Sequence, residues 1–132
     1  MIVFYKEISN WVMDSIGKSN DNMTAIGEVR DGMIIAGVAF ESYNGSNMIG
    51  HQRIISPPSR KFWINVADYI FNQAGCKRFT AMVHANNEKA IKLNLHIGFV
   101  IEATLKDAGP NCDLLVMTLW RENCKILKWI KK

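Results

Sequence analysis

The sequence predicts an α/β (α+β) fold in which helices pack on a mixed central sheet of about six to seven strands. The first observation is a pair of dipeptides typical of tight hairpin turns, Asp31-Gly32 and Asn44-Gly45, which separate apolar segments. The second is that short apolar runs alternate with helical spacings of apolar residues in the second half. Short connections and right-handed crossovers then give an antiparallel meander that continues as β-α-β-α-β-β, with parallel pairing at the centre.

The length of 132 residues predicts a single domain over residues 1–132. Its first element is predicted to be a helix within residues 1–17, followed by a loop over residues 17–22. The helix prediction rests on apolar residues that recur at the spacing of one helix face and stop before Gly17. These residues are Phe4, Ile8, Trp11, Val12 and Ile16.

The core is predicted over residues 24–120 and begins with the meander. Its three strands are expected at residues 24–30, 33–41 and 48–55. Pro57 and Pro58 end the third strand, because proline cannot donate a ladder hydrogen bond. Ser59 is expected to cap a helix of about four turns that ends at Gly75. The apolar stripe of this helix consists of Trp63, Val66, Ala67 and Ile70.

The rest of the core alternates strands and helices. The expected elements are a strand at 79–84, a helix at 88–97, a strand at 99–105, a turn at 107–113 and a strand at 114–120. Residues 121–132 are predicted to form either a short amphipathic helix through Cys124, Leu127 and Ile130 or a tail. The predicted order is therefore α, β, β, β, α, β, α, β, β.

Composition excludes several classes of protein. Hydrophobic residues make up 48% and charged residues 21%, which is a globular balance. The apolar run at residues 33–40 is far shorter than the roughly 20 residues of a membrane span. The first residues, with Lys6 and Glu7 inside the apolar stretch, do not resemble a secretory signal. A cytoplasmic protein without a membrane partner is therefore expected.

Cysteine and charge point to neither metal nor nucleic acid. The three cysteines, Cys76, Cys112 and Cys124, are widely spaced and include no C-x-x-C pair, so we expect reduced thiols and no metal site. The formal charge of +4 is concentrated in lysines near the C-terminus. No basic patch of the sequence is interleaved with aromatic residues on one strand, so a nucleic-acid partner is not expected.

Residues 83–99 carry the most specific pattern of the chain. Members of the Gcn5-related N-acetyltransferases have V-x-x-x-N-x-x-A-x-x-L-Y-x-x-x-G-F at this place in their fold. This sequence resembles them through Val83, Asn87, Ala90, Leu93, Gly98 and Phe99, with Asn94 in place of the tyrosine. Asn87 can cap the helix and Gly98 can close it in a left-handed turn. Any capped amphipathic helix would share the cap and the glycine, but not the full register.

The resemblance implies an acyl-CoA N-acyltransferase fold and acetyl-CoA as co-substrate. In the family, the edge of the fourth strand pairs with the pantetheine arm, which here corresponds to Ile54 and Ile55. The loop that follows carries R/Q-x-x-G-x-G/A, and its amides at a helix start hold the diphosphate. The matching residues are Ser59, Arg60, Lys61 and Phe62, together with Asn87 on the next helix. Trp63 and Asn65 stand where the two glycines belong.

The catalytic positions also depart from the family. Many members use a glutamate on a central strand as the base and the helix tyrosine as the acid, but here these positions hold Met82 and Asn94. Neither side chain transfers protons at neutral pH. Histidine can do so, and His84 shares a strand face with Met82, while His51 lies on the neighbouring strand. Glu41 is a weaker candidate. Replacement of His84 by alanine is expected to lower turnover more than replacement of His51.

Two functions follow from the sequence. The first is an acetyl-CoA-dependent N-acetyltransferase that acts on an amine of a small-molecule or protein acceptor. The second is a catalytically inactive structural or interaction protein with the same fold. A patchy similarity to acetyltransferase-like proteins packaged in T7-type bacteriophages, at residues 60–62, 68–69 and 87–98, supports the second function. A phage protein would reside in the host cytoplasm or the virion, and a homodimer is compatible with either function.

Overall fold

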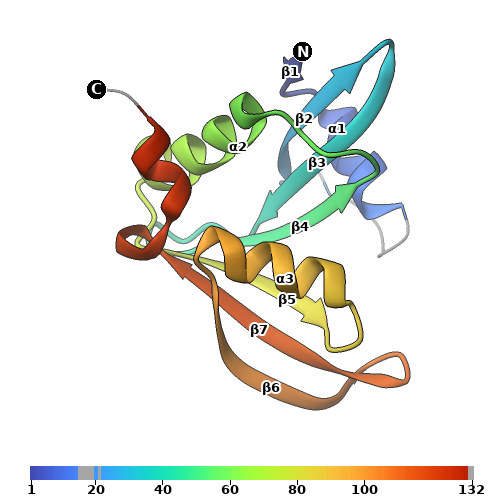
Figure 1. Cartoon of the computed structure of the whole chain (residues 1–132), viewed down its shortest axis with the longest axis vertical. Coiled ribbons are helices and arrows are strands. Elements are labelled where there is room, and N and C mark those ends of the chain that lie inside the picture. The colour runs from blue at the N-terminus through green and yellow to red at the C-terminus, as the bar shows by residue number, and fades with distance from the viewer. Residues whose placement is uncertain (15–19, 21, 131–132) are drawn as a thin grey trace.

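The computed structural model describes residues 1–14, 20 and 22–130. Within this part of the chain, seven strands form one sheet in the order β1-β2-β3-β4-β5-β7-β6 (Figure 1). The strands are Ile2–Val3 (β1), Thr24–Arg30 (β2), Met33–Glu41 (β3), Ile49–Ile54 (β4), Arg78–His84 (β5), Val100–Gly109 (β6) and Cys112–Trp120 (β7). β4 and β5 pair in parallel, and the other neighbours pair antiparallel. The predicted mixed sheet is confirmed.

Helices cover both faces of this sheet. They are Lys6–Met13 (α1), Arg60–Ala67 (α2), a π-helical continuation at Asp68–Gln73 (η1), Glu88–Ile97 (α3) and two short 3₁₀ segments at Arg121–Asn123 (η2) and Lys125–Trp129 (η3). α1 packs through Ile8 and Val12 on the face that carries Ala39. α2 and α3 pack on the opposite face, which carries Phe40 and Phe79. Among the described residues, every helix is too short or too polar to span a bilayer.

The N-terminal prediction needs correction. Ile2 and Val3 form a short edge strand against Glu28 and Gly27, so α1 begins only at Lys6. The terminal amine of Met1 also donates to the Val29 carbonyl at 2.9 Å. Phe4, which the helical spacing placed on the buried stripe, is 59% exposed. The predicted helix end at Ile16 and Gly17, and most of the predicted loop, lie at residues 15–19 and 21, outside the described residues.

α2 starts and the helical stretch ends as predicted. The Ser59 side chain accepts a hydrogen bond from the Phe62 amide at 3.2 Å, which is an N-cap. Gly75 closes the stretch with a φ of +68°. The helix widens to a π-helix from Asp68, whose carboxylate accepts hydrogen bonds from the side chains of Asn72 and Gln73. The sequence pattern had not indicated this widening.

The last strands are longer than predicted. β6 continues to Gly109 and β7 begins at Cys112, so the turn is confined to Pro110 and Asn111. After β7, the chain forms η2 and η3 instead of an α-helix or a free tail. Cys124 and Ile126 are 2% and 3% exposed and join the core under α2. Residues 131–132 lie outside the described part.

The sheet opens between β4 and β5. The two strands pair only through Ile49 with Thr80 and Gly50 with Ala81, and beyond these pairs they diverge (Figure 1). Gly50 is required at this point, because a Cβ atom there would lie 2.0 Å from the ring of Phe79. The divergence leaves a wedge-shaped opening in the middle of the sheet, with α2 and α3 on one side of it.

Candidate active site

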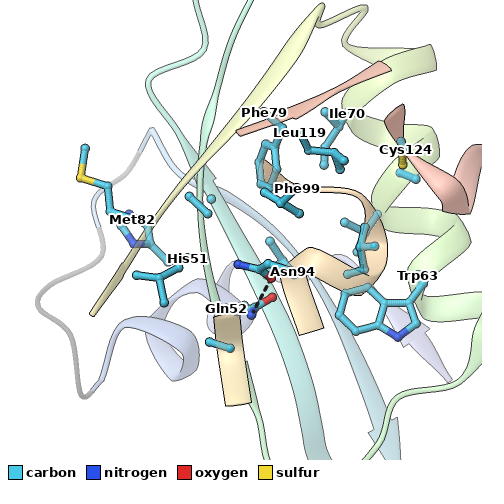
Figure 2. A pocket seen from close by; sticks show the side chains of 18 of the residues that line it. His51, Gln52, Trp63, Ile70, Phe79, Met82, Asn94, Phe99, Leu119 and Cys124 are labelled. Carbon is cyan, nitrogen blue, oxygen red and sulfur yellow. Dashed lines mark hydrogen bonds between the residues drawn. The ribbon is translucent and has the colours of Figure 1, made fainter. Parts of the chain in front are cut away.

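A pocket of about 370 Å³ occupies the opening between β4 and β5. α2 and α3 flank it on one face of the sheet, and His51, Met82 and His84 line it from β4 and β5. Four of the predicted site residues line it, namely His51, His84, Asn87 and Asn94. Ile54, Ile55, Ser59, Arg60, Lys61 and Phe62 are not among the residues that line it. Figure 2 shows His51, Gln52 and Asn94 on one side of this pocket and Phe79 and Leu119 on another.

The backbone amide and carbonyl groups of every second residue of β4 face the opening. The Thr80 amide donates to the Met48 carbonyl at 3.0 Å, so Met48 directs its backbone groups toward β5. Because backbone direction alternates along a strand, Gln52 and Ile54 do the same beyond the point where β5 turns away. The Ile55 amide instead donates to the Ile35 carbonyl of β3 at 2.8 Å. Of the two predicted strand residues, only Ile54 therefore directs its amide and carbonyl away from β3, along the edge of β4 that lies beyond its pairing with β5.

His51 is held by a carboxylate on the α1 side of the opening. It lies opposite Ala39 on β3, so its side chain shares the sheet face that α1 covers. Its Nε2 atom contacts the carboxylate of Glu41, two residues further along β3. The two side chains are 18% and 30% exposed. An imidazole that is oriented in this way by a carboxylate keeps Nδ1 to take up a proton.

His84 is placed differently. Phe79 and Val83 of β5 point into the core, so Met82 and His84 point to the opposite face. His84 lines the outer part of the pocket and is exposed. Met82 is 45% exposed and lies near His51 (Figure 2). Of the two histidines, His51 is the one that is both partly buried and oriented by a partner.

Asn94 is buried in the wall of the pocket. It is 2% exposed, and its Oδ1 accepts a hydrogen bond from the Gln52 side chain at 3.4 Å (Figure 2). Its Nδ2 lies 3.7 Å from the sulfur of Met117. The side chain can donate a hydrogen bond to a bound group but cannot supply a proton. Gln52 was not among the predicted site residues, although a polar residue on the strand face that also carries Gly50 and Ile54 was a usable signal in the sequence.

Asn87 caps α3, as predicted. Its Oδ1 accepts from the Ala90 amide at 3.2 Å, and its own amide donates to the His84 carbonyl at 2.9 Å. The side chain is exposed and lines the pocket, and its NH₂ group takes no part in the cap. At the other end of α3, Gly98 has a φ of +125°, and a Cβ atom there would lie 2.1 Å from the Asn123 carbonyl oxygen.

The start of α2 is held by a buried acid from β2. The Ser59 amide donates to Oε1 of Glu28 at 2.8 Å, and Arg30 donates to Oε2 at 3.3 Å. Burial raises the pKa of Glu28, but the hydrogen bonds from Ser59 and Arg30 outweigh it, so this pKa lies below its ordinary value of 4.5. Arg30 also donates to the Pro57 carbonyl at 3.4 Å. Glu28 and Arg30 thus fix the loop between β4 and α2.

In the first turn of α2, Phe62 and Arg60 contact other parts of the protein and do not line the pocket. Phe62 is fully buried, and its amide is bonded to Ser59, so it contacts the core and not the pocket. The guanidinium of Arg60 lies 4.7 Å from the ring centroid of Trp129 in η3. Lys61 is exposed. Because the helix already starts at Arg60, the amides from Trp63 onward have acceptors within the helix, and the indole of Trp63 lines the pocket.

The innermost part of the pocket is apolar. It is bounded by Ile70 of η1, Phe79 of β5, Phe99 and Leu119 of β7, each at most 7% exposed (Figure 2). Cys124 closes this end, and burial raises the pKa of its thiol, so the group stays neutral. Within the described residues, no three His, Cys, Asp or Glu side chains lie close enough to hold a metal ion.

Comparison with solved structures identifies the fold. Spermidine/spermine N-acetyltransferase SpeG from Vibrio cholerae matches with a TM-score of 0.66 and 19% identity, over 85% of this chain and 72% of that chain. N-acetyltransferase PseH from Campylobacter jejuni, in complex with acetyl coenzyme A, matches with a TM-score of 0.61 and 18% identity, over 77% of this chain and 70% of that one. The chain has the N-acetyltransferase fold. No protein-family model and no curated protein matches its sequence.

Proposed function

We propose that this protein is an acetyl-CoA-dependent N-acetyltransferase. The observation that carries this proposal is the pocket in the opened sheet, which joins the free edge of β4 to the pair of His51 and Glu41. The likeness to PseH, which was solved with acetyl coenzyme A, supports the choice of co-substrate. Fold alone does not determine activity, so the weight rests on this arrangement of groups.

The coenzyme would enter from the face that carries α2 and α3. The backbone of Gln52 and Ile54 would pair with the amides of the pantetheine arm, in the manner of an added strand. The side-chain NH₂ of Asn87 would donate to the same arm. The phosphates would lie near Arg60 and Lys61, whose amides occupy the first helical turn and have no acceptor inside the helix.

The acceptor amine would reach the thioester from the α1 face, where His51 lies. Nδ1 of His51 takes one proton from the ammonium group, directly or through a water molecule, and Glu41 stabilises the resulting charge. The amine nitrogen then bonds to the carbonyl carbon and loses its second proton to solvent. The carbon–sulfur bond breaks, and the sulfur leaves as a thiolate that takes up a proton. Asn94 cannot supply that proton, so it comes from protonated His51 or from solvent.

Binding is tested by thermal denaturation with acetyl-CoA. A ligand at 100 times its dissociation constant stabilises the folded state by about 2.7 kcal/mol, which raises the melting temperature. Release of free thiol is then followed with spermidine as the first amine, since SpeG is a spermidine N-acetyltransferase. His51→Ala is expected to lower turnover by roughly 10²–10⁴-fold, and His84→Ala much less. This reverses the order expected from the sequence, because His51 is oriented by Glu41 and His84 is exposed.

The second candidate is a catalytically inactive interaction protein with the same fold. The start of α2 favours it, because the segment that carries a glycine-rich phosphate loop in the family is helical here and places Trp63 in the pocket. An unchanged melting temperature at millimolar acetyl-CoA would argue against an acetyl-CoA-dependent enzyme and favour this candidate. Equal and near-wild-type turnover in both histidine variants would remove histidine from the mechanism.

A further inference from the structure

The distribution of polarity along the pocket carries information on the acyl group. The polar side chains that line it belong to residues on β4, on α3 and near the end of β5: His51, Gln52, His84, Asn87 and Asn94. The inner end has hydrocarbon side chains and one neutral thiol, among them Ile70, Phe79, Phe99 and Leu119. The pocket is therefore polar toward its opening and apolar at its closed end.

The apolar end is hollow because small residues line it. Ala67 of α2, which is 2% exposed, and Ala81 of β5 each contribute one side-chain carbon to the wall. Trp63, Ala67 and Ile70 lie on one face of the α2 and η1 stretch, so the pocket follows this helix for about two turns, or roughly 10 Å. Protein interiors are usually close-packed, and an apolar pocket of this size with an open end is typical of a ligand site.

The orientation of a bound acyl-CoA follows from the same asymmetry. Phosphates and peptide-like amides cannot leave water without hydrogen-bond partners, and the apolar end offers none. The coenzyme must therefore keep its charged end outside and its thioester beside Gln52 and Asn94. The acyl group is the part that continues past the thioester, toward Ile70 and Leu119.

We infer that the pocket selects acyl groups longer than acetyl, in the range of butyryl to hexanoyl, and places their hydrocarbon chain between α2 and β5. This inference rests on the proposed function: it keeps acetyl-CoA as a donor and ranks acyl-CoA donors with longer chains above it. Each methylene that enters the apolar end adds about 0.8 kcal/mol of binding free energy, which corresponds to about a threefold to fourfold gain in affinity. Butyryl-CoA should therefore bind about tenfold more tightly than acetyl-CoA.

The test measures the affinities of the wild-type protein for CoA, acetyl-CoA, butyryl-CoA and hexanoyl-CoA by titration calorimetry. The expected result is a rise in affinity with chain length up to hexanoyl. Acetyl-CoA that binds as tightly as butyryl-CoA, or more tightly, overturns the inference and leaves the proposed function standing. Absence of binding by all four compounds overturns the proposed function, and the inference with it.

Substitutions in the wall of the pocket test where the hydrocarbon chain of the acyl group lies. Ala67→Leu fills the apolar end and is expected to lower hexanoyl-CoA affinity by at least about tenfold while acetyl-CoA affinity changes by less than about twofold. Ala74→Leu, close to the end of the same helical stretch and outside this pocket, should change neither. Ile70→Val, a milder change that enlarges the end by one methyl group, should move the preference toward longer chains. Equal losses for all esters in Ala67→Leu, or no shift in Ile70→Val, would contradict the inference.

Discussion

The starts of α2 and α3 flank the same pocket and are built alike, since a side-chain oxygen caps each helix at its third amide. They differ in what surrounds the cap. Ser59 is bonded to buried Glu28, and Phe62 after it is fully buried. Asn87 is exposed and lines the pocket. The start of α2 is thus held in place by hydrogen bonds and core packing, whereas the start of α3 remains accessible to a ligand.

This difference shows which departures from the family pattern matter. The segment that starts α3 matches the N-acetyltransferase sequence pattern except at Asn94. It contributes the polar side chains of Asn87 and Asn94 to the pocket. At α2, Trp63 and Asn65 stand at the two glycine positions of that pattern, and both lie inside a helix that begins at Arg60. Substitutions of Ser59 and Phe62 at the start of α2 should therefore act mainly on stability, and substitutions at Asn87 mainly on ligand affinity.

Phe62→Ala gives the largest expected effect on stability. Removal of a fully buried aromatic ring costs about 3–5 kcal/mol of unfolding free energy. Urea denaturation measures this loss. Lys61→Ala, next to it and exposed, is the control and should change stability by less than about 0.5 kcal/mol. Similar stabilities of the two variants would show that the start of α2 is not part of the core.

Glu28→Gln tests the acid that holds this helix start. The variant keeps an acceptor for the Ser59 amide but loses the charge, so we expect a loss of about 1–3 kcal/mol at neutral pH. The pKa of Glu28 is lowered in the folded state, so its charged form stabilises the protein fully above about pH 4.5. This contribution is lost as the pH falls through the lowered pKa.

The measurement is urea denaturation of both proteins between about pH 6 and pH 3. The difference between wild type and Glu28→Gln should shrink as the pH falls. The pKa values of Asp68 and Glu102 are lowered as well, so both proteins become less stable in acid. The quantity that tests the prediction is therefore the difference in unfolding free energy between the two proteins. A difference that stays constant with pH would show that the charge of Glu28 does not stabilise the fold.

Asn87 is tested with two variants. Asn87→Ala removes the cap and should cost about 1 kcal/mol of stability, whereas Asn87→Ser keeps a capping oxygen and should cost little. Both variants lack the side-chain NH₂ group, so both should bind acetyl-CoA more weakly than wild type. Urea denaturation and calorimetric titration separate the two effects. Wild-type affinity in Asn87→Ser would exclude a role of this amide in ligand binding.

The contact between Arg60 and Trp129 gives the smallest expected effect. A double-mutant cycle with Arg60→Ala and Trp129→Ala should yield a coupling energy of about 0.5–1 kcal/mol, as expected for a cation–π contact near the surface. Denaturant unfolding of the four proteins gives this value. A coupling near zero would mean that η3 is held on α2 by apolar packing alone.

Local signals predicted much of the fold. Asp31-Gly32 predicted the end of β2 and the start of β3, and the cap at Asn87 together with Gly98 predicted the bounds of α3. Asn44-Gly45 does not form the expected two-residue turn, because residues 42–48 separate β3 from β4. β1 was missed because two residues are too few to show a period. The extension of β6 to Gly109 was missed because this edge strand is exposed along its length and lacks an apolar pattern.

The site depends on contacts that are distant in the sequence. His51 meets Glu41 only because the register of β3 and β4 sets Ala39 opposite His51. Ser59 meets Glu28 across 31 positions of the sequence. Residue types could identify these histidines and the serine as candidates. Three findings required the packed structure. They are the preference for His51 over His84 as the proposed base, the hydrogen bond of the Ile55 amide to β3, and the apolar end of the pocket.

The link between β4 and β5 consists of two residue pairs, so side-chain packing supports most of the contact between the two halves of the sheet. Phe79 lies at the centre of that packing, with its ring centroid 5.8 Å from that of Phe40 and 6.1 Å from that of Phe99. Changes in ring size at these three positions can alter the splay of the two strands while the backbone ladders stay intact. The opening is therefore the part of this fold in which the shape of the pocket can diverge during evolution without a change of topology.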